Sequence, residues 1–214
     1  MRSLLAFFLI CLFILGTMAC GSSSSPKQFC DTVCIKDTIR FMGKHALEPE
    51  LGLVPQDCGV DSIWWTYEGL GAYRKSDLGF RDVKLNPKFI KCLFRDTSYA
   101  FLLFNDCRTG RGYQVQIPIT KTGTYSKRSS GINNFDTRFA VAEDMVAYTD
   151  RGNIYVEDVA TGKKAMMTFG QATDMDYDAI HETLDSVNIT SERIYVKIKL
   201  NGKWEELDKK ITLK

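Results

Sequence analysis

Residues 146–163 read VAYTDRGNIYVEDVATGK. Apolar and polar side chains alternate on both sides of the polar group DRGN at residues 150–153, a pattern typical of two half-buried β-strands joined by a turn. A second turn signal, ATGK at residues 160–163, follows the second run. The segment therefore predicts an antiparallel hairpin that continues into a third strand.

Short alternating runs of this kind occur along most of the chain, with turn signals between them. Asn201-Gly202 is the strongest hairpin signal, because a type I′ turn needs φ > 0 at both central positions. Many short strands at such spacing predict an all-β protein of antiparallel meander units. The strands that we predict are residues 38–43, 62–68, 82–86, 89–94, 99–105, 112–119, 139–141, 145–149, 153–159, 164–169, 186–190, 193–200, 203–207 and 210–213.

Three similar segments begin at Ser98, Asp144 and Glu192, and each is followed by a turn and a second strand. A poorer fourth copy begins at Asp61. A repeat of forty to fifty residues suits the four-stranded blade of a β-propeller. We therefore expect one all-β domain over residues 29–214 with propeller-like repeat units, and a two-sheet β-sandwich is the alternative.

The hairpin of residues 146–163 resembles the blade repeats of Tol-type periplasmic propellers and of the propeller domains of prolyl oligopeptidases. In that pattern an apolar strand precedes a polar turn, and the next strand ends in Asp-x-x-Thr-Gly, here residues 158–162. The resemblance is confined to this hairpin, so it implies a local structure and no particular activity.

The N-terminus has the pattern of a secretion signal. A basic start is followed by an apolar run over residues 4–15 and then by GTMA before Cys20. The run is shorter than the roughly 20 residues of a membrane-spanning helix. Cys20 resembles the lipobox cysteine of bacterial lipoproteins, which is acylated and becomes the new N-terminus, although Thr17 stands where that family usually has Leu.

The lipoprotein resemblance implies a signal peptide over residues 1–19 and a lipid anchor on Cys20. The membrane is then a partner through the acyl chains, and the protein lies at the cell envelope, on the periplasmic face or the outer surface of a bacterial membrane. Residues 20–28 form the lipidated cysteine and a tether, because Gly/Ser runs such as 21–25 behave as flexible coil.

Five cysteines remain once Cys11 and Cys20 are set aside, and all lie in the first half of the chain. In an oxidising compartment they predict two disulfides and one leftover thiol, with the pairing left open. A zinc site is disfavoured, because the chain has no Cys-x₂-Cys and only His45 is nearby. The five are Cys30, Cys34, Cys58, Cys92 and Cys107.

The composition argues against some partners. The net charge is +2, so no strong attraction to nucleic acid is expected. An aromatic share of 12% favours a well-packed β-rich core over a disordered chain. The sequence has no glycine loop that would cradle phosphate, and we predict no cofactor.

Asp174, Asp176 and Asp178 alternate and could place several oxygens around one calcium ion. The EF-hand pattern then requires Gly and Glu at its sixth and twelfth positions, where this chain has Ala179 and Asp185. A solvated acidic loop, or a short helix that starts near Asp178, fits the sequence better.

Trp64, Trp65 and Tyr73 could form an aromatic platform for sugar rings or a peptide. Adjacent residues of a strand face opposite sides, so at least one of the two tryptophans is expected in the core. Residues 121–138 are the longest polar stretch and are interpreted as a loop that either contacts a ligand or only connects strands.

His45 and His181 are isolated in the sequence, and no nucleophile elbow is present, so we assign no catalytic residue. The sequence favours a non-catalytic envelope protein that binds a partner or supports an assembly. A carbohydrate- or peptide-binding module is the alternative. A hydrolase is the least favoured function, because it needs one of the two histidines within hydrogen-bond reach of a Ser, Asp or Glu.

Overall fold

The computed structural model describes residues 28–67, 74–120, 124–169 and 180–214. Two helical turns accompany the strands, η1 (Pro87–Phe89) and α2 (Ile180–Thr183). The strands are β1 (Ile39–Met42), β2 (Glu50–Gln56), β3 (Gly59–Thr66), β4 (Arg74–Lys84), β5 (Ile90–Arg95), β6 (Tyr99–Asn105), β7 (Gly112–Pro118), β8 (Ser126–Ile132), β9 (Phe139–Val141), β10 (Met145–Asp150), β11 (Asn153–Asp158), β12 (Lys164–Thr168), β13 (Leu184–Ile189), β14 (Arg193–Leu200) and β15 (Lys203–Lys210).

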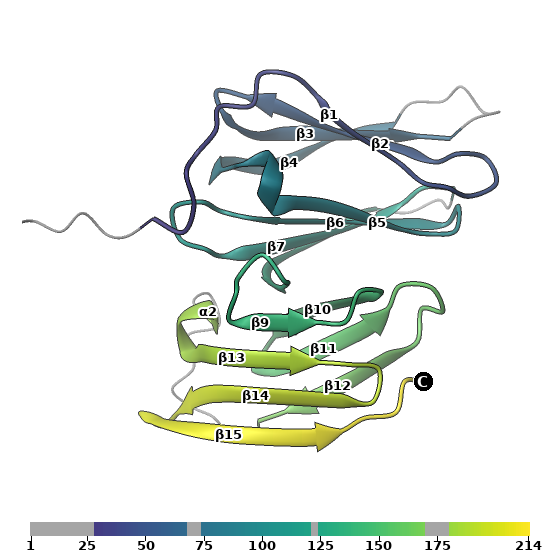
Figure 1. Cartoon of the computed structure of the whole chain (residues 1–214). Helices are drawn as coiled ribbons and strands as arrows, with labels where there is room; N and C mark the ends of the chain where they lie inside the picture. The colour runs from purple at the N-terminus through teal and green to yellow at the C-terminus, as the bar shows by residue number, and fades with distance from the viewer. Residues whose placement is uncertain (1–27, 68–73, 121–123, 170–179) are drawn as a thin grey trace, which may run out of the picture.

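The strands form three sheets (Figure 1). Their orders are β1-β2-β3-β4, β12-β11-β10-β8-β7-β6-β5 and β15-β14-β13-β9. Neighbouring strands are antiparallel except β9 and β13, which run parallel. The seven-stranded sheet curls, so that its two ends belong to different halves of the molecule.

The curled sheet is shared by two lobes. In the N-terminal lobe the sheet β1–β4 packs on β5, β6 and β7, and in the C-terminal lobe the sheet of β9, β13, β14 and β15 packs on β10, β11 and β12 (Figure 1). Strand β8 connects the lobes through its pairing with β7 and β10.

Each lobe has its own apolar core, built by alternation along the strands. In β6, Ala100, Leu102 and Phe104 face the core of the N-terminal lobe, and in β11, Ile154 and Val156 face that of the C-terminal lobe. All five are almost completely buried. Burial of a large aliphatic or aromatic side chain contributes about 1.5–3 kcal/mol, so these two layers hold the sheets together.

The opposite face of the curled sheet forms a third, smaller cluster between the lobes. Phe101 and Leu103 of β6 meet Val146 of β10 and Val159 there. The same strands therefore supply a lobe core with one face and the contact between the lobes with the other.

The all-β prediction is confirmed, but the sheets do not divide as the repeat predicts. The segments that begin at Ser98 and Asp144 both contribute to the seven-stranded sheet, and the segment that begins at Glu192 contributes to another. The reason is β8, which joins the strands of two repeat units into one sheet. The described strands thus form two lobes around a curled sheet in place of successive four-stranded blades.

Strands β2 and β8 lie outside every predicted range, and the predictions cover only residues 82–84 of β4. Strand β2 contains Gly52 and Pro55, which usually interrupt strands, and the register shifts between Val54 and Pro55. Strand β8 falls within residues 121–138, which we interpreted as a loop because of their polar side chains. That interpretation is wrong for residues 126–132, since β8 is held between two neighbours by backbone pairing rather than by apolar burial.

Candidate functional site

Two disulfides fix the beginning of the described chain to the body. Cys30 bonds to Cys107, and Cys34 bonds to Cys58. The prediction of two disulfides and one leftover thiol is therefore confirmed. The leftover thiol is Cys92, which packs against the core of the N-terminal lobe, and burial raises its pKa.

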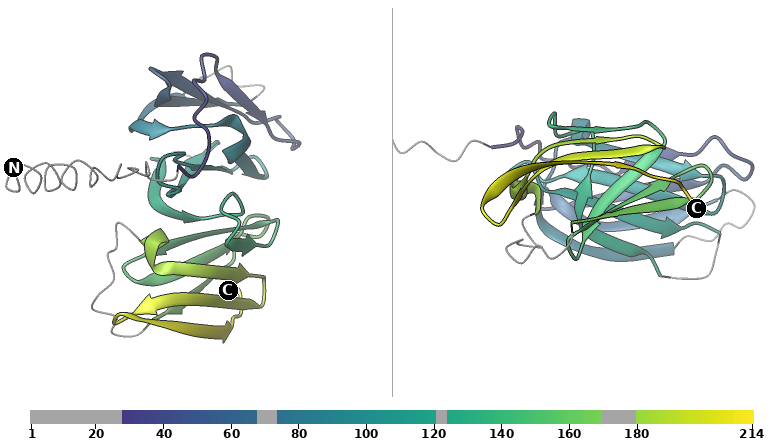
Figure 2. Two further views of the ribbon diagram at one scale, coloured as in Figure 1. Left: turned by 60° about the vertical axis from the view of Figure 1, so that its left-hand side comes forward. Right: turned by 90° about the horizontal axis from the view of Figure 1, so that it is seen from below.

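The Cys30–Cys107 bridge lies beside the junction of the lobes. The backbone nitrogens of Phe29 and Cys30 both donate to the carbonyl of Cys107, at 2.9 and 3.1 Å. The purple start of the described chain accordingly lies next to the junction in both figures that show the whole molecule (Figures 1 and 2). The described chain therefore begins beside the junction of the two lobes.

The β6–β7 turn positions this end of the chain. Its sequence is Asp106-Cys107-Arg108-Thr109-Gly110, a second copy of Asp-x-x-Thr-Gly that our sequence reasoning missed. The Thr109 hydroxyl donates to Asp106 Oδ2 at 2.8 Å, and the Gly110 nitrogen donates to the Asp106 carbonyl at 2.7 Å. Gly110 has φ +76°, which favours glycine. A search for the motif of residues 158–162 elsewhere in the chain would have found it.

Aromatic rings gather around this turn. A Cβ on Gly110 would lie 2.9 Å from Cδ2 of Phe29, so the Phe29 ring packs directly on the glycine. The Phe29 and Phe89 rings are 5.4 Å apart and the Phe89 and Phe135 rings 5.9 Å apart, both edge to face. They form one side of an open groove of about 460 Å³, lined by Gln28, Phe29, Phe89, Arg108, Thr109, Phe135, Asp136, Thr137 and Arg138.

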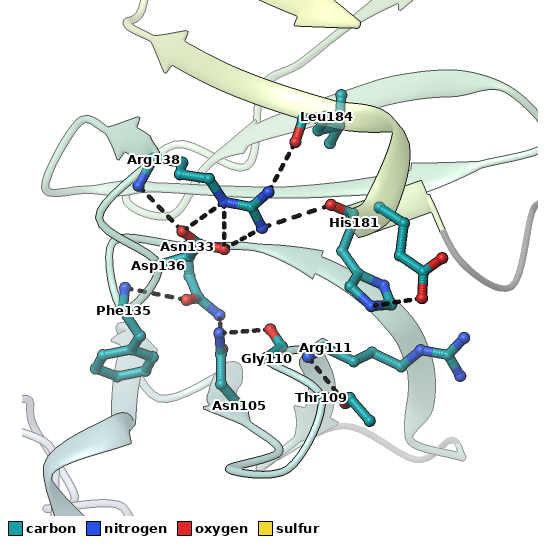
Figure 3. A network of polar contacts seen from close by, with 11 residues as sticks. Asn105, Thr109, Gly110, Arg111, Asn133, Phe135, Asp136, Arg138, His181 and Leu184 are labelled. Atoms are coloured by element: carbon teal, nitrogen blue, oxygen red, sulfur yellow. Dashed lines mark hydrogen bonds and ion pairs between the residues drawn. The ribbon is translucent and has the colours of Figure 1, made fainter. Parts of the chain in front are cut away.

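A polar network lies next to the residues that line this junction groove (Figure 3). Asn105 Nδ2 donates to the Gly110 carbonyl at 3.1 Å, and Asn133 Nδ2 donates to Asn105 Oδ1 at 2.7 Å. The Phe135 nitrogen donates in turn to Asn133 Oδ1 at 3.1 Å. Both asparagines are buried, so the bonds hold the β6–β7 turn and the segment after β8 in fixed relation.

Arg138 carries the network into the C-terminal lobe (Figure 3). Its Nη2 lies 2.6 Å from Asp136 Oδ2, and its Nη1 donates to the Leu184 carbonyl at 3.0 Å. Burial raises the pKa of Asp136, but the hydrogen bonds and the charge of Arg138 outweigh it, and the pKa is lowered overall. The hydrogen bond to Asp136 is the main reason that the pKa of Arg138 is raised.

Arg108 is the more accessible cation of the groove. Just over half of its side chain is exposed, and its Nε lies 4.0 Å from Asp106 Oδ2. Its Nη2 donates to the Asp82 carbonyl at 3.2 Å. A guanidinium held loosely in this way can form a bidentate bond with an incoming carboxylate.

The two histidines lie in different lobes. His45 is in the β1–β2 connection, where its carbonyl accepts from the Glu48 nitrogen at 2.9 Å. His181 is on α2, and its pKa is lowered by burial and by the charge of Arg111. Its Nε2 lies 3.8 Å from Glu182 Oε1, which is too long for a hydrogen bond.

His181 also lines a small, partly open cavity of about 10 Å³ together with Ser130. The Ser130 hydroxyl donates to the Thr149 carbonyl, so its proton already has an acceptor. A cavity of this size has room for about one water molecule and not for a substrate. The hydrolase hypothesis therefore gains no support from this side of the junction.

The remaining candidate residues are spread over the molecule. Trp65 lies in the core of the N-terminal lobe, and Trp64 lies on the outer face of the sheet β1–β4. Cys20, Tyr73, Asp174, Asp176 and Asp178 lie outside the described residues, as do the signal sequence and most of the tether.

The described residues contain neither a metal-binding cluster nor a membrane-spanning helix. Within residues 28–67, 74–120, 124–169 and 180–214, no group of three or more His, Cys, Asp or Glu side chains could hold a metal ion. In the same residues no helix is long and apolar enough to cross a membrane.

Comparison of the chain with models of protein families, with curated proteins and with solved structures gives no match. The propeller resemblance of residues 146–163 therefore stays a local one. The junction groove has to be interpreted from its own chemistry.

Proposed function

We propose that this protein is an exported, membrane-anchored binding protein that holds a peptide segment of a protein partner in the junction groove and catalyses no reaction. The anchor is the acylated Cys20 of the lipoprotein pattern. The observation that carries the proposal is the groove itself, with three phenylalanine rings beside an accessible arginine at the place where the chain leaves the body.

The location of the protein supports this function. The two disulfides indicate an oxidising compartment outside the cytoplasm, in agreement with a secretion signal. The Cys30–Cys107 bridge also keeps the exit of the tether close to the groove. A partner that is bound there is held near the membrane.

The chemistry of the groove suits one kind of occupant. Aromatic side chains and arginine are enriched in the energetically important parts of protein interfaces. The rings of Phe89 and Phe135 offer apolar contact, and the exposed part of Arg108 offers a charged hydrogen bond. A peptide with an apolar side chain next to a carboxylate would use both.

Site-specific photo-crosslinking in membranes of producing cells tests the proposal. A photoreactive residue at Thr137, which is exposed and lines the groove, should give one discrete higher-mass adduct with a protein. The same residue at exposed Lys203 of β15 is the matched control and should give none. Arg108→Ala should reduce the adduct at least fivefold, and Cys20→Ser should release the protein from the membrane fraction.

Two results would contradict the proposal. Equal crosslinking from positions 137 and 203 would show that the groove has no specific partner. A Cys20→Ser protein that stays in the membrane fraction as firmly as the wild type would remove the anchor.

A further inference from the structure

The outer face of the sheet β1–β4 carries a second arrangement that the junction groove does not use. In the register of the sheet, Arg40 of β1, Gly52 of β2 and Trp64 of β3 form one row across three strands. Trp65 faces the core, so alternation places Trp64 and its row on the outside.

Gly52 determines how the indole lies. A Cβ at position 52 would lie 2.1 Å from Cε2 and 2.3 Å from Nε1 of Trp64, well inside any permitted contact. The ring therefore covers the backbone of β2, with one face against the sheet and the other face outward. Only glycine permits this close approach, so this position of the Trp64 ring requires Gly52.

Arg40 lies over the indole on the outer face of the sheet and is paired there with Glu50. The Arg40 guanidinium carbon lies 5.5 Å from the ring centroid, and Arg40 Nη1 lies 3.4 Å from Glu50 Oε1. Two thirds of the Arg40 side chain is exposed. An ion pair with so exposed a guanidinium contributes little to stability, so Arg40 can turn toward a ligand at small cost.

A half-buried indole with a mobile guanidinium over it, which a ligand can displace, matches one class of ligand. One face of a pyranose ring is a layer of C–H groups, which pack on the electron-rich face of an aromatic ring, while the hydroxyls point to the sides. We propose that the row Arg40–Gly52–Trp64 binds a glycan chain of β-linked, gluco-configured units. In that configuration every ring substituent is equatorial, so both ring faces stay apolar and flat.

Met42 extends the same surface. It follows Arg40 by two residues on β1, faces the same side and is 69% exposed. A second sugar unit of the chain can pack on this flexible apolar side chain. The site lies on the sheet β1–β4 and its ligand is a glycan, so the inference stands or falls separately from the junction groove.

Saturation-transfer NMR, in which the signals of the sugar are detected, tests the inference. The sample is the full-length chain with both disulfides intact, in a detergent whose headgroup carries no sugar. Cellotriose should receive saturation on its ring C–H protons and show a saturable Kd in the millimolar range or below. An α-linked mannotriose, which has an axial hydroxyl on each ring, should bind at least fivefold more weakly.

Three variants distinguish binding at the row Arg40–Gly52–Trp64 from non-specific contact with the sugar. Trp64→Ala should abolish the transfer, whereas Trp204→Ala, which removes a half-exposed tryptophan from β15, should leave it unchanged. Gly52→Ala keeps Trp64 but forces the indole off β2, and it should weaken binding at least tenfold.

Thermal unfolding of each variant shows that it is folded under the conditions of the titration. Transfer that persists in a folded Trp64→Ala protein would overturn the inference. So would the absence of saturable transfer to cellotriose in the wild-type chain, or equal binding of cellotriose and mannotriose.

Discussion

Arg95 joins the two lobes through a single side chain. Its Nε donates to the Val159 carbonyl at 2.7 Å, and its Nη2 is paired with Glu157. The guanidinium also lies over the Phe101 ring, 5.4 Å from its centroid. The exposed fractions of the Arg95 and Glu157 side chains are 14% and 5%, so the pair is largely screened from water.

Loss of one partner from such a pair leaves a buried charge without its counterpart. We predict that Arg95→Ala lowers the free energy of unfolding by about 3 kcal/mol, because only the exposed Lys164 then remains beside Glu157. Urea unfolding followed by circular dichroism measures the change. Arg193→Ala is the control, since its pair with Asp208 is exposed and should matter little. Equal effects of the two substitutions would exclude a special role for Arg95.

Asp136 makes the stability of the folded protein depend on pH. Its pKa in the folded protein lies below the ordinary 3.8 because hydrogen bonds from Arg138 outweigh burial. The stabilisation is therefore complete above the unfolded pKa and is lost as the pH falls toward the folded pKa. We predict that Asp136→Asn removes part of the decline in stability below pH 4. Urea midpoints from pH 7 to pH 3 test this, and parallel curves for wild type and variant would contradict it.

At the scale of elements, the two Asp-x-x-Thr-Gly turns perform the same task. In each, the aspartate and threonine fix the turn and the glycine has a positive φ. Because glycine has no Cβ, a side chain from a distant segment packs against each of the two glycines. Gly110 receives Phe29, and Gly162 receives Arg95, whose Nη1 would lie 2.7 Å from a Cβ at that position.

Gly162 and Gly202 form a matched pair for testing this role. Their φ values are +73° and +76°, but nothing lies within 4 Å of a Cβ added to Gly202. We predict that Gly202→Ala costs about 1 kcal/mol from backbone strain alone. Gly162→Ala should cost about 2 kcal/mol or more, because it also displaces Arg95. Chemical unfolding of both variants gives the comparison, and equal losses would show that Arg95 does not depend on the turn.

At the scale of the whole molecule, the disulfides constrain loops of very different length. The bonded cysteines are 77 residues apart in Cys30–Cys107 and 24 residues apart in Cys34–Cys58. Chain-entropy arguments predict that bridges closing loops of these lengths stabilise the folded protein by about 4.5 and about 3.5 kcal/mol. Replacing each pair by serines should therefore destabilise the protein more for Cys30 and Cys107. Urea unfolding of the two double variants decides the order, and a larger loss from the shorter loop would contradict this view.

Much of the architecture could be predicted because alternation is a local signal. The predicted strands at residues 99–105, 139–141 and 193–200 agree with β6, β9 and β14. The grouping of strands into sheets could not be predicted, because it depends on β8, whose polar side chains carry no apolar pattern. The repeat in sequence therefore predicts successive blades, which the sheets do not form.

The junction groove was harder to predict than the fold. Its phenylalanines are far apart in the sequence, and Phe29 precedes the region where strands begin. Only the disulfide partner of Cys30 reveals where that ring lies, and the sequence leaves this pairing open. Trp64, in contrast, was among the predicted candidates, although its dependence on Gly52 becomes visible only in the register of β2 and β3.

If Cys20 is the acylated anchor that we propose, the bridge between residues 30 and 107 also limits the distance between the protein and the bilayer. A polypeptide covers at most about 3.6 Å per residue, so the stretch from Cys20 to Cys30 spans no more than about 36 Å. An acylated Cys20 would then confine the groove to the layer immediately above the lipid headgroups. A protein partner of the groove would then have to reach into that layer. It could be a protein anchored in the same leaflet or the projecting end of a larger protein.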